Sequence, residues 1–149
     1  MKPRSGLLLA AAWTLLGLTR LLTVVLPFRA IRHLLGEHRS PNGANPASGP
    51  VPPPADARDE NRARQIGWAV RTAAHRTPWR SDCYPQALAA RVLLRLARVP
   101  HAVTFGVRRD DAGTLKAHAW VSAGRVAVAG GTGHSWVGVG NFTWSPRGR

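Results

Sequence analysis

Apolar residues recur at helical spacing in the first two thirds of the chain. Residues 6–26 carry leucine, alanine or valine every three or four positions, which predicts a helix with an apolar seam, and a shorter continuation is expected over residues 29–35, ending at Gly36. The same spacing predicts helices over residues 61–76 and 83–98. The last of these is apolar over much of its circumference, so we expect it to be a central, largely buried helix.

In the remaining third of the chain, apolar residues alternate with polar ones, which is typical of strands with one buried face. The pattern predicts strands at residues 101–108, 115–121 and 125–129, with a two-residue turn at Ala123-Gly124 before the last strand. Consecutive strands joined by short turns form an antiparallel meander. Helices followed by such a meander predict an α+β fold.

The composition divides the chain into three parts. Residues 1–36 form the apolar N-terminal region, which we interpret as a docking helix region, and residues 37–60 form a linker rich in Pro, Gly, Asn and Ser. Residues 61–149 form the predicted domain. Its glycine- and arginine-rich tail is expected to dock through Trp136 and residues 142–144.

The N-terminal helix has three interpretations. The uncharged run, residues 5–19, is shorter than the roughly 20 residues of a spanning helix, and Arg20 interrupts the apolar stretch that follows. No small-residue cleavage site closes the stretch, which disfavours a signal peptide. A helix that docks on a partner, or on the rest of the chain, is favoured, and a membrane anchor remains the alternative.

Charge and cysteine content narrow the class of protein. The 149 residues include 21 Lys and Arg against 7 Asp and Glu, giving a net charge of +14. Such a charge favours an anionic partner, whether nucleic acid, a membrane surface, a nucleotide or an acidic peptide, without indicating which. Aromatic residues do not interleave with the arginines as in a stacking platform, so we expect no nucleic-acid partner. One Cys and six scattered His give no thiolate-rich or H-x-x-H metal site, and the single Cys fits a reducing, cytoplasmic compartment.

The only cysteine lies where the third helix is expected to begin. Ser81 or Asp82 can cap that helix, and Pro85 is tolerated in its first turn. The positive end of a helix favours a thiolate, so Cys83 is a candidate nucleophile, although a small buried apolar residue is the simpler interpretation. His118 follows in a predicted strand, and a Cys at a helix start with a His on a strand is the arrangement of cysteine proteases and transglutaminase-like enzymes.

Four sequence motifs together resemble one known family. They are the stretches 79–88 (WRSDCYPQAL), 98–100 (RVP), 105–110 (FGVRRD) and 117–121 (AHAWV), and residues 20–36 add to the likeness. In this order and spacing they resemble the leader peptidases of lasso-peptide biosynthesis, of the split type whose leader-binding domain is a separate chain. These are transglutaminase-like cysteine proteases.

The resemblance implies a fold, a reaction and partners. A nucleophile helix would pack on the antiparallel meander, Cys83 would attack the peptide bond between leader and core, and His118 would transfer the proton. The implied partners are the precursor peptide, a separate leader-binding protein (a RiPP recognition domain) and a lasso cyclase resembling asparagine synthetase. The family's peptidase step has been linked to ATP, but the sequence contains no Gly-x-x-x-x-Gly-Lys-Ser/Thr loop, and no cofactor is evident.

The sequence departs from this family at the third catalytic residue. The family carries an Asp about twelve residues after the His, which would fall at Gly130, and no Asp or Glu follows Asp111. With the predicted turn, His118 would lie opposite Ala129. A backbone carbonyl, a water or Asn141 can instead orient the imidazole, or the enzyme is slower, or the protein is degenerate.

The remaining candidates each have two interpretations. Gln86, one helical turn after Cys83, can donate to an oxyanion or simply pack. Trp79 and Trp120 are core aromatics or walls of a peptide groove. Asp82 is expected to be the N-cap of the helix. We therefore expect a cytoplasmic cysteine peptidase that removes the leader from a lasso-peptide precursor and that can associate with a membrane through the N-terminal helix. The alternative is a membrane-associated adaptor that presents the precursor without hydrolysing it.

Overall fold

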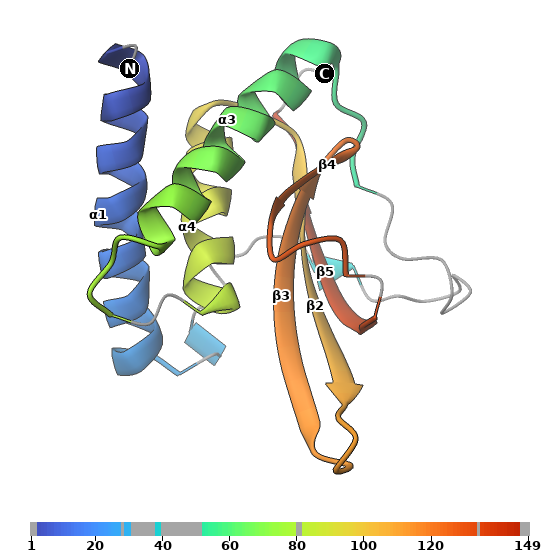
Figure 1. Cartoon of the computed structure of the whole chain (residues 1–149). Coiled ribbons are helices and arrows are strands. Elements are labelled where there is room, and N and C mark those ends of the chain that lie inside the picture. The colour runs from blue at the N-terminus through green and yellow to red at the C-terminus, as the bar shows by residue number, and fades with distance from the viewer. Residues whose placement is uncertain are drawn as a thin grey trace.

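In the computed structural model, helices cover one face of an antiparallel sheet (Figure 1). The structure describes residues 3–27, 29–30, 38–39, 52–79, 82–133 and 135–146. Its helices are α1 (Pro3–Val25), α3 (Ala57–Ala74) and α4 (Cys83–Leu96). Its strands are β1 (His38–Arg39), β2 (His101–Arg109), β3 (Leu115–Ala123), β4 (Val126–Ala129) and β5 (Val137–Trp144), in the sheet order β1-β5-β2-β3-β4. The fold is α+β.

The helix boundaries follow from their caps. The side chain of Asp56 accepts a hydrogen bond of 2.8 Å from the backbone N–H of Asp59, so α3 begins at Ala57, four residues before the predicted start. At the other end of the layer, α4 stops at Leu96, and Arg98 takes a positive φ of 57°. The predicted helix over residues 29–35 and most of the predicted linker lie outside the described residues.

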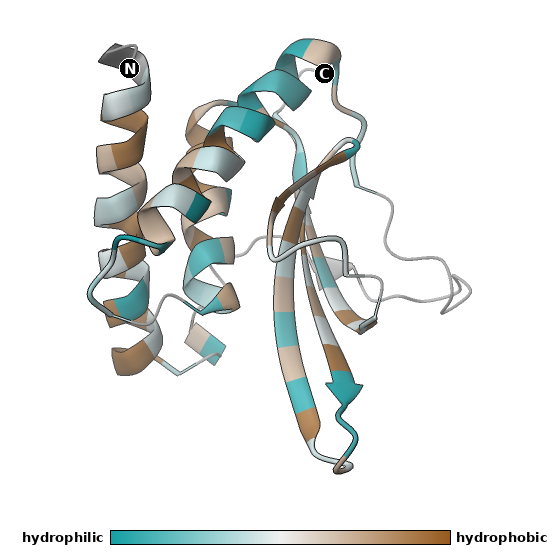
Figure 2. Cartoon of the chain, viewed as in Figure 1, coloured by the Kyte–Doolittle hydropathy of each residue, from teal (hydrophilic) through white to brown (hydrophobic). Residues whose placement is uncertain are grey.

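Helix α1 packs against α3 and α4 with one of its faces. Apolar residues follow the helix (Figure 2), but of the side chains described in it, residues 5–25, only Ala12, Leu16 and Thr19 are buried. The Thr19 hydroxyl donates to the carbonyl oxygen of Pro85 over 3.2 Å, and it also donates to Leu16 O within α1. The helix is therefore tied to the first turn of α4 by a buried polar contact as well as by apolar packing.

The hairpin between β3 and β4 differs from the prediction by one residue. Ala123 pairs with Val126, so the turn is Gly124-Arg125, with Gly124 at φ 54°. The register then shifts beside Val121, which pairs with Ala129. The expected pairing of His118 with Ala129 is therefore wrong, because a later turn and a bulge move β4 along β3.

The tail of the chain supplies β5, which the sequence pattern did not reveal. This strand pairs with β2, and a connection over residues 130–136 carries the chain from β4 across to the other side of β2 (Figure 1). Its first half alternates valine with glycine, a pattern with little strand propensity. The predicted meander of β2, β3 and β4 is present, but the sheet continues beyond β2 on its other side.

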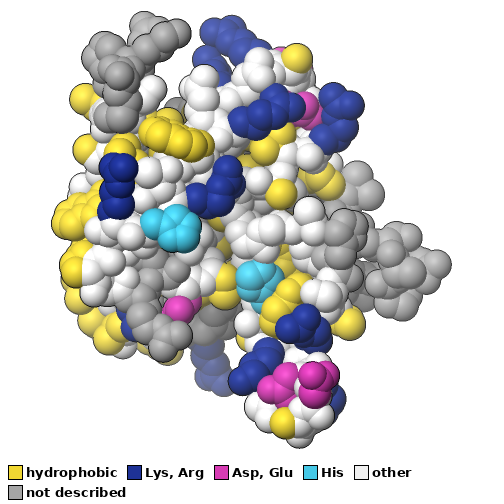
Figure 3. Space-filling model, in the orientation of Figure 1, with side chains coloured by type: hydrophobic (Ala, Val, Ile, Leu, Met, Phe, Trp, Pro, Cys, Tyr) yellow, Lys and Arg dark blue, Asp and Glu magenta, His cyan; other side chains and the backbone are white. Residues whose placement is uncertain are grey.

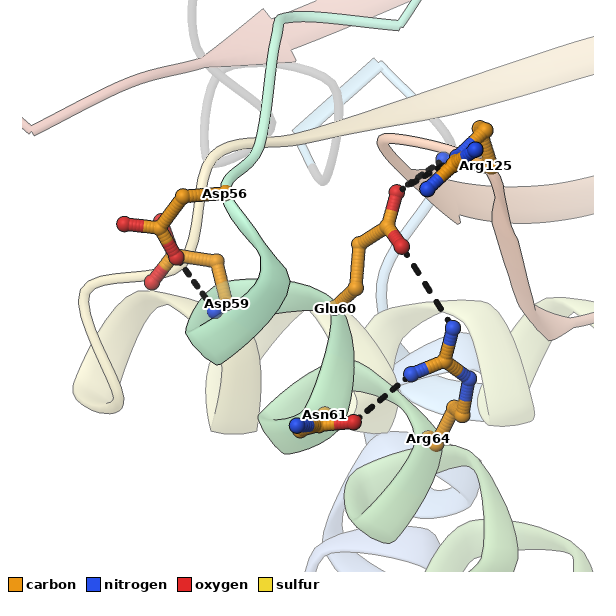
Figure 4. Close-up of polar contacts among 6 residues, drawn as sticks. All are labelled: Asp56, Asp59, Glu60, Asn61, Arg64 and Arg125. Carbon is orange, nitrogen blue, oxygen red and sulfur yellow. Dashed lines mark hydrogen bonds and ion pairs between the residues drawn. The ribbon is translucent and has the colours of Figure 1, made fainter.

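Helix α3 holds β4 through backbone contacts. Glu60 accepts hydrogen bonds from the backbone N–H and the Nε of Arg125, at 3.1 and 3.3 Å, and it pairs with Arg64 (Figure 4). These bonds, first of all the one from the Arg125 backbone, lower the pKa of the Glu60 carboxyl. At Gly67 a Cβ would lie 2.8 Å from Val128 O, so the helix and the strand are in direct backbone contact.

Replacing Leu16 by Ala tests the packing of α1 within the chain. Leu16 is fully buried, so we expect Leu16→Ala to lower the free energy of unfolding by about 3 kcal/mol. The matched Leu18→Ala removes the same atoms from an exposed position on the same helix and should change it by no more than about 0.5 kcal/mol. Urea unfolding measures both, and equal losses would contradict the observed packing.

His101 gives the fold a pH dependence. The ring is fully buried at the start of β2, its Nδ1–H donates to Val99 O over 2.8 Å, and burial, with a smaller contribution from Arg91 and Arg95, lowers its pKa to about 4. The unfolded chain, with a pKa near 6.5, binds the proton first. Stability is therefore complete above about pH 6.5 and falls by about 3 kcal/mol as the pH drops through about 4.

His101→Asn should remove most of this loss, because an amide can replace the Nδ1–H donor and does not titrate. His75→Asn, at the exposed end of α3, is the control and should keep the pH dependence of the wild type. The measurement is urea unfolding between pH 4 and pH 7. An unchanged slope in His101→Asn would show that another group is responsible.

Candidate active site

Cys83 is the first residue of α4, and its side chain is half-buried. Asp82 occupies the N-cap position, with φ −66° and ψ 173°, but its carboxylate makes no capping hydrogen bond. It lies instead 3.8 Å from Arg20 Nη1 of α1, in a partly exposed ion pair. The prediction that Asp82 is the N-cap residue is therefore confirmed for its position, but the carboxylate lies near Arg20 and makes no capping hydrogen bond. Ser81, the other candidate cap, lies outside the described residues.

The first turn of α4 lies over the middle of the sheet. The Tyr84 ring, next to Cys83 in sequence, makes an edge contact with Phe105 of β2 at a centroid distance of 5.7 Å. Phe105 pairs across the ladder with Ala119 of β3. The cysteine end of the helix is thus placed beside the strand position that follows His118.

His118 projects from the face of β3 that lies away from the helices. Ala119 and Val121 belong to the core under the helices, and side chains alternate along a strand, so His118 shares the opposite face with Trp120. Strand β4 pairs with β3 only from Val121 onward, and Gly130, which follows β4, packs against the backbone of β3 at Ala119. In the described part of the chain, the edge of β3 before His118 has no strand partner on this side. Within the same residues no hydrogen bond joins Cys83 to His118.

A backbone carbonyl orients the imidazole. His118 Nε2 lies 2.7 Å from the carbonyl oxygen of Gly130, just beyond the end of β4. A carbonyl oxygen only accepts, so Nε2 carries the hydrogen of this bond, and in the neutral ring Nδ1 keeps the lone pair. Of the alternatives left open by the sequence, the structure contains the backbone carbonyl, and the base nitrogen of this tautomer is Nδ1.

Two indole rings also stack on the imidazole, and a guanidinium contacts one of them. Trp136 stacks on His118 at a centroid distance of 4.7 Å and an interplanar angle of 25°, and Trp120 lies at 6.0 Å and 24°. Arg108 lies over the Trp136 ring at 4.6 Å and donates to Ser135 over 3.3 Å. The sequence suggested only that Trp136 docks, because nothing in a glycine-rich segment indicates which strand it crosses.

Gly130 cannot be exchanged for the missing aspartate within this backbone. Its φ is 76°, a conformation that side chains rarely adopt, and a Cβ would meet the carbonyl oxygen of Ala119 and lie 2.8 Å from the Cα of Trp120. The chain here approaches β3 too closely for any side chain. The carbonyl of Gly130, and not its side-chain position, is therefore the group available to His118.

The other predicted residues lie at different distances from this cluster. Trp120 is buried beneath the imidazole. Asn141 accepts a hydrogen bond of 3.3 Å from Thr104, and β2 separates its strand from β3, so it is not the partner of His118. Trp79 packs on α1, against the ring of Trp13 at 5.2 Å.

Gln86 lies one turn into α4, where its backbone N–H donates to Asp82 O over 3.3 Å, and its side chain is half-buried. Its role as an oxyanion donor stays a prediction. Within the described residues, no group of three or more His, Cys, Asp or Glu side chains is placed to hold a metal ion. The chemistry that these side chains offer is that of a thiol, an imidazole and backbone hydrogen bonds.

The sequence matches one protein family, described as the transglutaminase-like superfamily, over residues 22–143. The match covers most of the chain and includes Cys83, His118 and Gly130. The chain matches no curated protein and no solved structure.

Gly130→Asp tests the close approach of residue 130 to β3. We expect it to lower the free energy of unfolding by at least about 2 kcal/mol more than Gly131→Asp does. Gly131 is the matched control, because its φ is 74° but a Cβ there would meet nothing within 4 Å. Thermal or urea unfolding makes the comparison, and equal losses would show that only backbone strain, not contact with β3, excludes a side chain at residue 130.

Proposed function

Because the chain belongs to the transglutaminase-like superfamily, we propose that it is a cysteine peptidase in which Cys83 is the nucleophile and His118 the base. Members of this superfamily are typically cysteine proteases or acyltransferases. The chain has a single cysteine, which begins the central helix of the fold. No other thiol competes for the role.

The observation that carries the proposal is the bond between His118 and Gly130. This bond keeps the hydrogen on Nε2 and leaves Nδ1 free to accept a proton. A catalytic imidazole needs the same arrangement, in which one ring nitrogen donates to an orienting group and the other acts as the base. The His118–Trp136 stack fixes the plane of the ring in addition.

In the first half of the reaction the thiol attacks the peptide carbonyl. Nδ1 of His118 takes the thiol proton as the sulfur–carbon bond forms, and the carbonyl oxygen becomes an oxyanion, for which Gln86 is the candidate side-chain donor. The carbon–nitrogen bond then breaks, and the imidazolium returns the proton to the leaving amine. Cys83 and His118 share no hydrogen bond in this structure, and His118 lies on the face of β3 opposite α4, so the mechanism requires a rearrangement that brings the thiol within hydrogen-bonding distance of Nδ1 when substrate binds.

In the second half, water releases the acyl group. Nδ1 removes a proton from the water, the oxygen adds to the thioester carbon, and the sulfur leaves and is reprotonated. A neutral carbonyl orients the imidazole but stabilises the imidazolium less than a carboxylate does. Turnover slower than that of an enzyme with an acidic third residue is the expected consequence.

We propose a lasso-peptide precursor as the substrate, on the strength of the family resemblance of stretches 79–88, 98–100, 105–110 and 117–121. Cleavage between leader and core would free the core amine for a cyclase resembling asparagine synthetase. A separate leader-binding protein would deliver the precursor. The edge of β3 before His118, residues 115–117, pairs with no strand on the β4 side among the described residues, which supports an extended peptide as substrate, because an unpaired strand edge can pair with one.

A non-hydrolytic adaptor is the second candidate. The missing acidic residue near His118 favours it. An acyltransferase would use the same thioester but pass the acyl group to an amine in place of water. The products therefore distinguish hydrolysis from transfer.

Cys83→Ala should abolish cleavage of the precursor while leaving its binding intact. His118→Ala should reduce cleavage by at least about a hundredfold, because it removes the general base. His75→Ala, at the exposed end of α3, is the control and should cleave like the wild type. Mass spectrometry of the precursor, with the leader-binding protein added, detects the leader and core products.

Cleavage by Cys83→Ala at the rate of the wild type would disprove the mechanism. Binding of the precursor by a folded wild-type protein without any cleavage would favour the adaptor. A product carrying an added amine in place of a free carboxylate would identify an acyltransferase.

A further inference from the structure

Helix α1 has a second apolar face that the fold leaves uncovered. Leu7, Leu18, Leu21 and Val25 are between 50% and 79% exposed, and with Ala10 and Thr14 they form one stripe at spacings of three and four residues. We call these six residues the outer stripe. Figure 3 shows hydrophobic side chains gathered along the flank that α1 forms.

The outer stripe contains no side-chain polar group in need of water. Its one hydroxyl, on Thr14, donates to the carbonyl oxygen of Ala10 over 3.0 Å, within the helix. Thr23, nearby on α1, satisfies its hydroxyl in the same way on Arg20 O at 2.8 Å. Such a surface enters an apolar medium without leaving a donor unpaired.

The charged residues of the N-terminal segment are all basic. Residues 1–36 contain no Asp or Glu. Lys2 precedes α1 in the sequence, Arg4 is in the first turn of the helix, and the exposed Arg29 follows it. An apolar stripe between cationic ends matches the boundary of a bilayer with anionic headgroups, where apolar burial and charge attraction act together. We propose that α1 binds such a lipid surface, lying in its plane with the outer stripe immersed.

The inner face of α1 decides between lying on the bilayer and crossing it. By length and composition, residues 5–25 are sufficient to cross a membrane. However, Leu16 is buried against the fold, the Thr19 hydroxyl bonds to Pro85, and Arg20 pairs with Asp82. A spanning helix would lose all three contacts and bring a guanidinium into hydrocarbon, whereas an in-plane helix keeps them.

The same charges oppose a second copy of the chain as the occupant. If two copies packed antiparallel through the outer stripe, Arg29 of each would face the Lys2 and Arg4 end of the other. A parallel pair would bring identical cationic ends together. Because residues 1–36 hold no carboxylate, nothing in this region compensates that repulsion.

Lipid binding through this flank leaves the active site accessible. The α1 helix lies on the outside of the helical layer, and the β2–β3 hairpin lies on the far side of the molecule (Figure 1). His118 therefore faces away from the bilayer, toward a precursor in solution. The binding does not require that the chain be a peptidase, so its test is independent of cleavage.

The experiment is co-sedimentation of the full-length protein with vesicles, either of phosphatidylcholine alone or of phosphatidylcholine with phosphatidylglycerol. We expect binding to the anionic vesicles that weakens as salt is raised. Leu18→Gln with Leu21→Gln should weaken it by about tenfold or more. The matched control, Leu96→Gln with Leu115→Gln, changes two leucines that are 76% and 59% exposed outside α1, and it should stay within about twofold of the wild type.

A second variant, Arg4→Gln with Arg29→Gln, keeps the outer stripe and should reduce the preference for anionic over neutral vesicles. Equal binding to both vesicles by the wild type, or no loss in the double leucine variant, would overturn the proposal. Wild-type protein that resists extraction from membranes by alkaline carbonate would show a spanning helix instead. A wild-type dimer that the leucine variant converts to monomers, without vesicle binding, would make the second copy the occupant.

Discussion

The close contact between α3 and β4 determines where the Gly130 carbonyl lies, and that carbonyl fixes the imidazole. Gly67 lets the helix touch the backbone of Val128, and Arg71 donates to the Val128 carbonyl over 2.9 Å. At the other end of β4, Glu60 holds the turn through the N–H of Arg125. Strand β4 is therefore held near both of its ends. Because Gly130 directly follows β4, the position of its carbonyl, and with it the orientation of His118, is fixed as well.

The loss of an acidic residue and the gain of a carbonyl partner are the same structural event at Gly130. With φ at 76° the peptide turns its oxygen toward His118, and it brings the chain so close to Trp120 that no side chain fits. A carboxylate at this position would need a different backbone. The dipole of the Gly130 carbonyl, which does not titrate, takes the place of a carboxylate charge. It still orients the His118 ring, but it stabilises the imidazolium less.

Much of the fold could be predicted from the sequence, because local spacing decides it. The apolar periodicities of α3 and α4 and the alternation of β2 and β3 each appear within a few residues, and a Cys at a helix start is visible in the same way. What could not be predicted depends on contacts between distant segments. The valine–glycine run that opens β5 becomes a strand because it pairs with β2, and the Asp82 carboxylate at the N-cap lies near Arg20 of α1 in place of making a capping hydrogen bond. The carbonyl partner of His118 was foreseen only as one option, since any residue has a carbonyl.

Helix α1 lies between the apolar flank and the segment that carries Cys83, the candidate nucleophile. Its inner face contacts α4 at Pro85, two residues after Cys83, and its Trp13 contacts Trp79, four residues before it. The segment that carries the candidate nucleophile is therefore braced on both sides by one helix. A helix in that position cannot leave the fold without releasing the first turn of α4, so substitutions on the inner face of α1 also disturb the position of Cys83. The outer face of α1 makes no such contact with the fold, yet it is also apolar. We therefore expect a partner outside the chain, such as a lipid surface, to contact it.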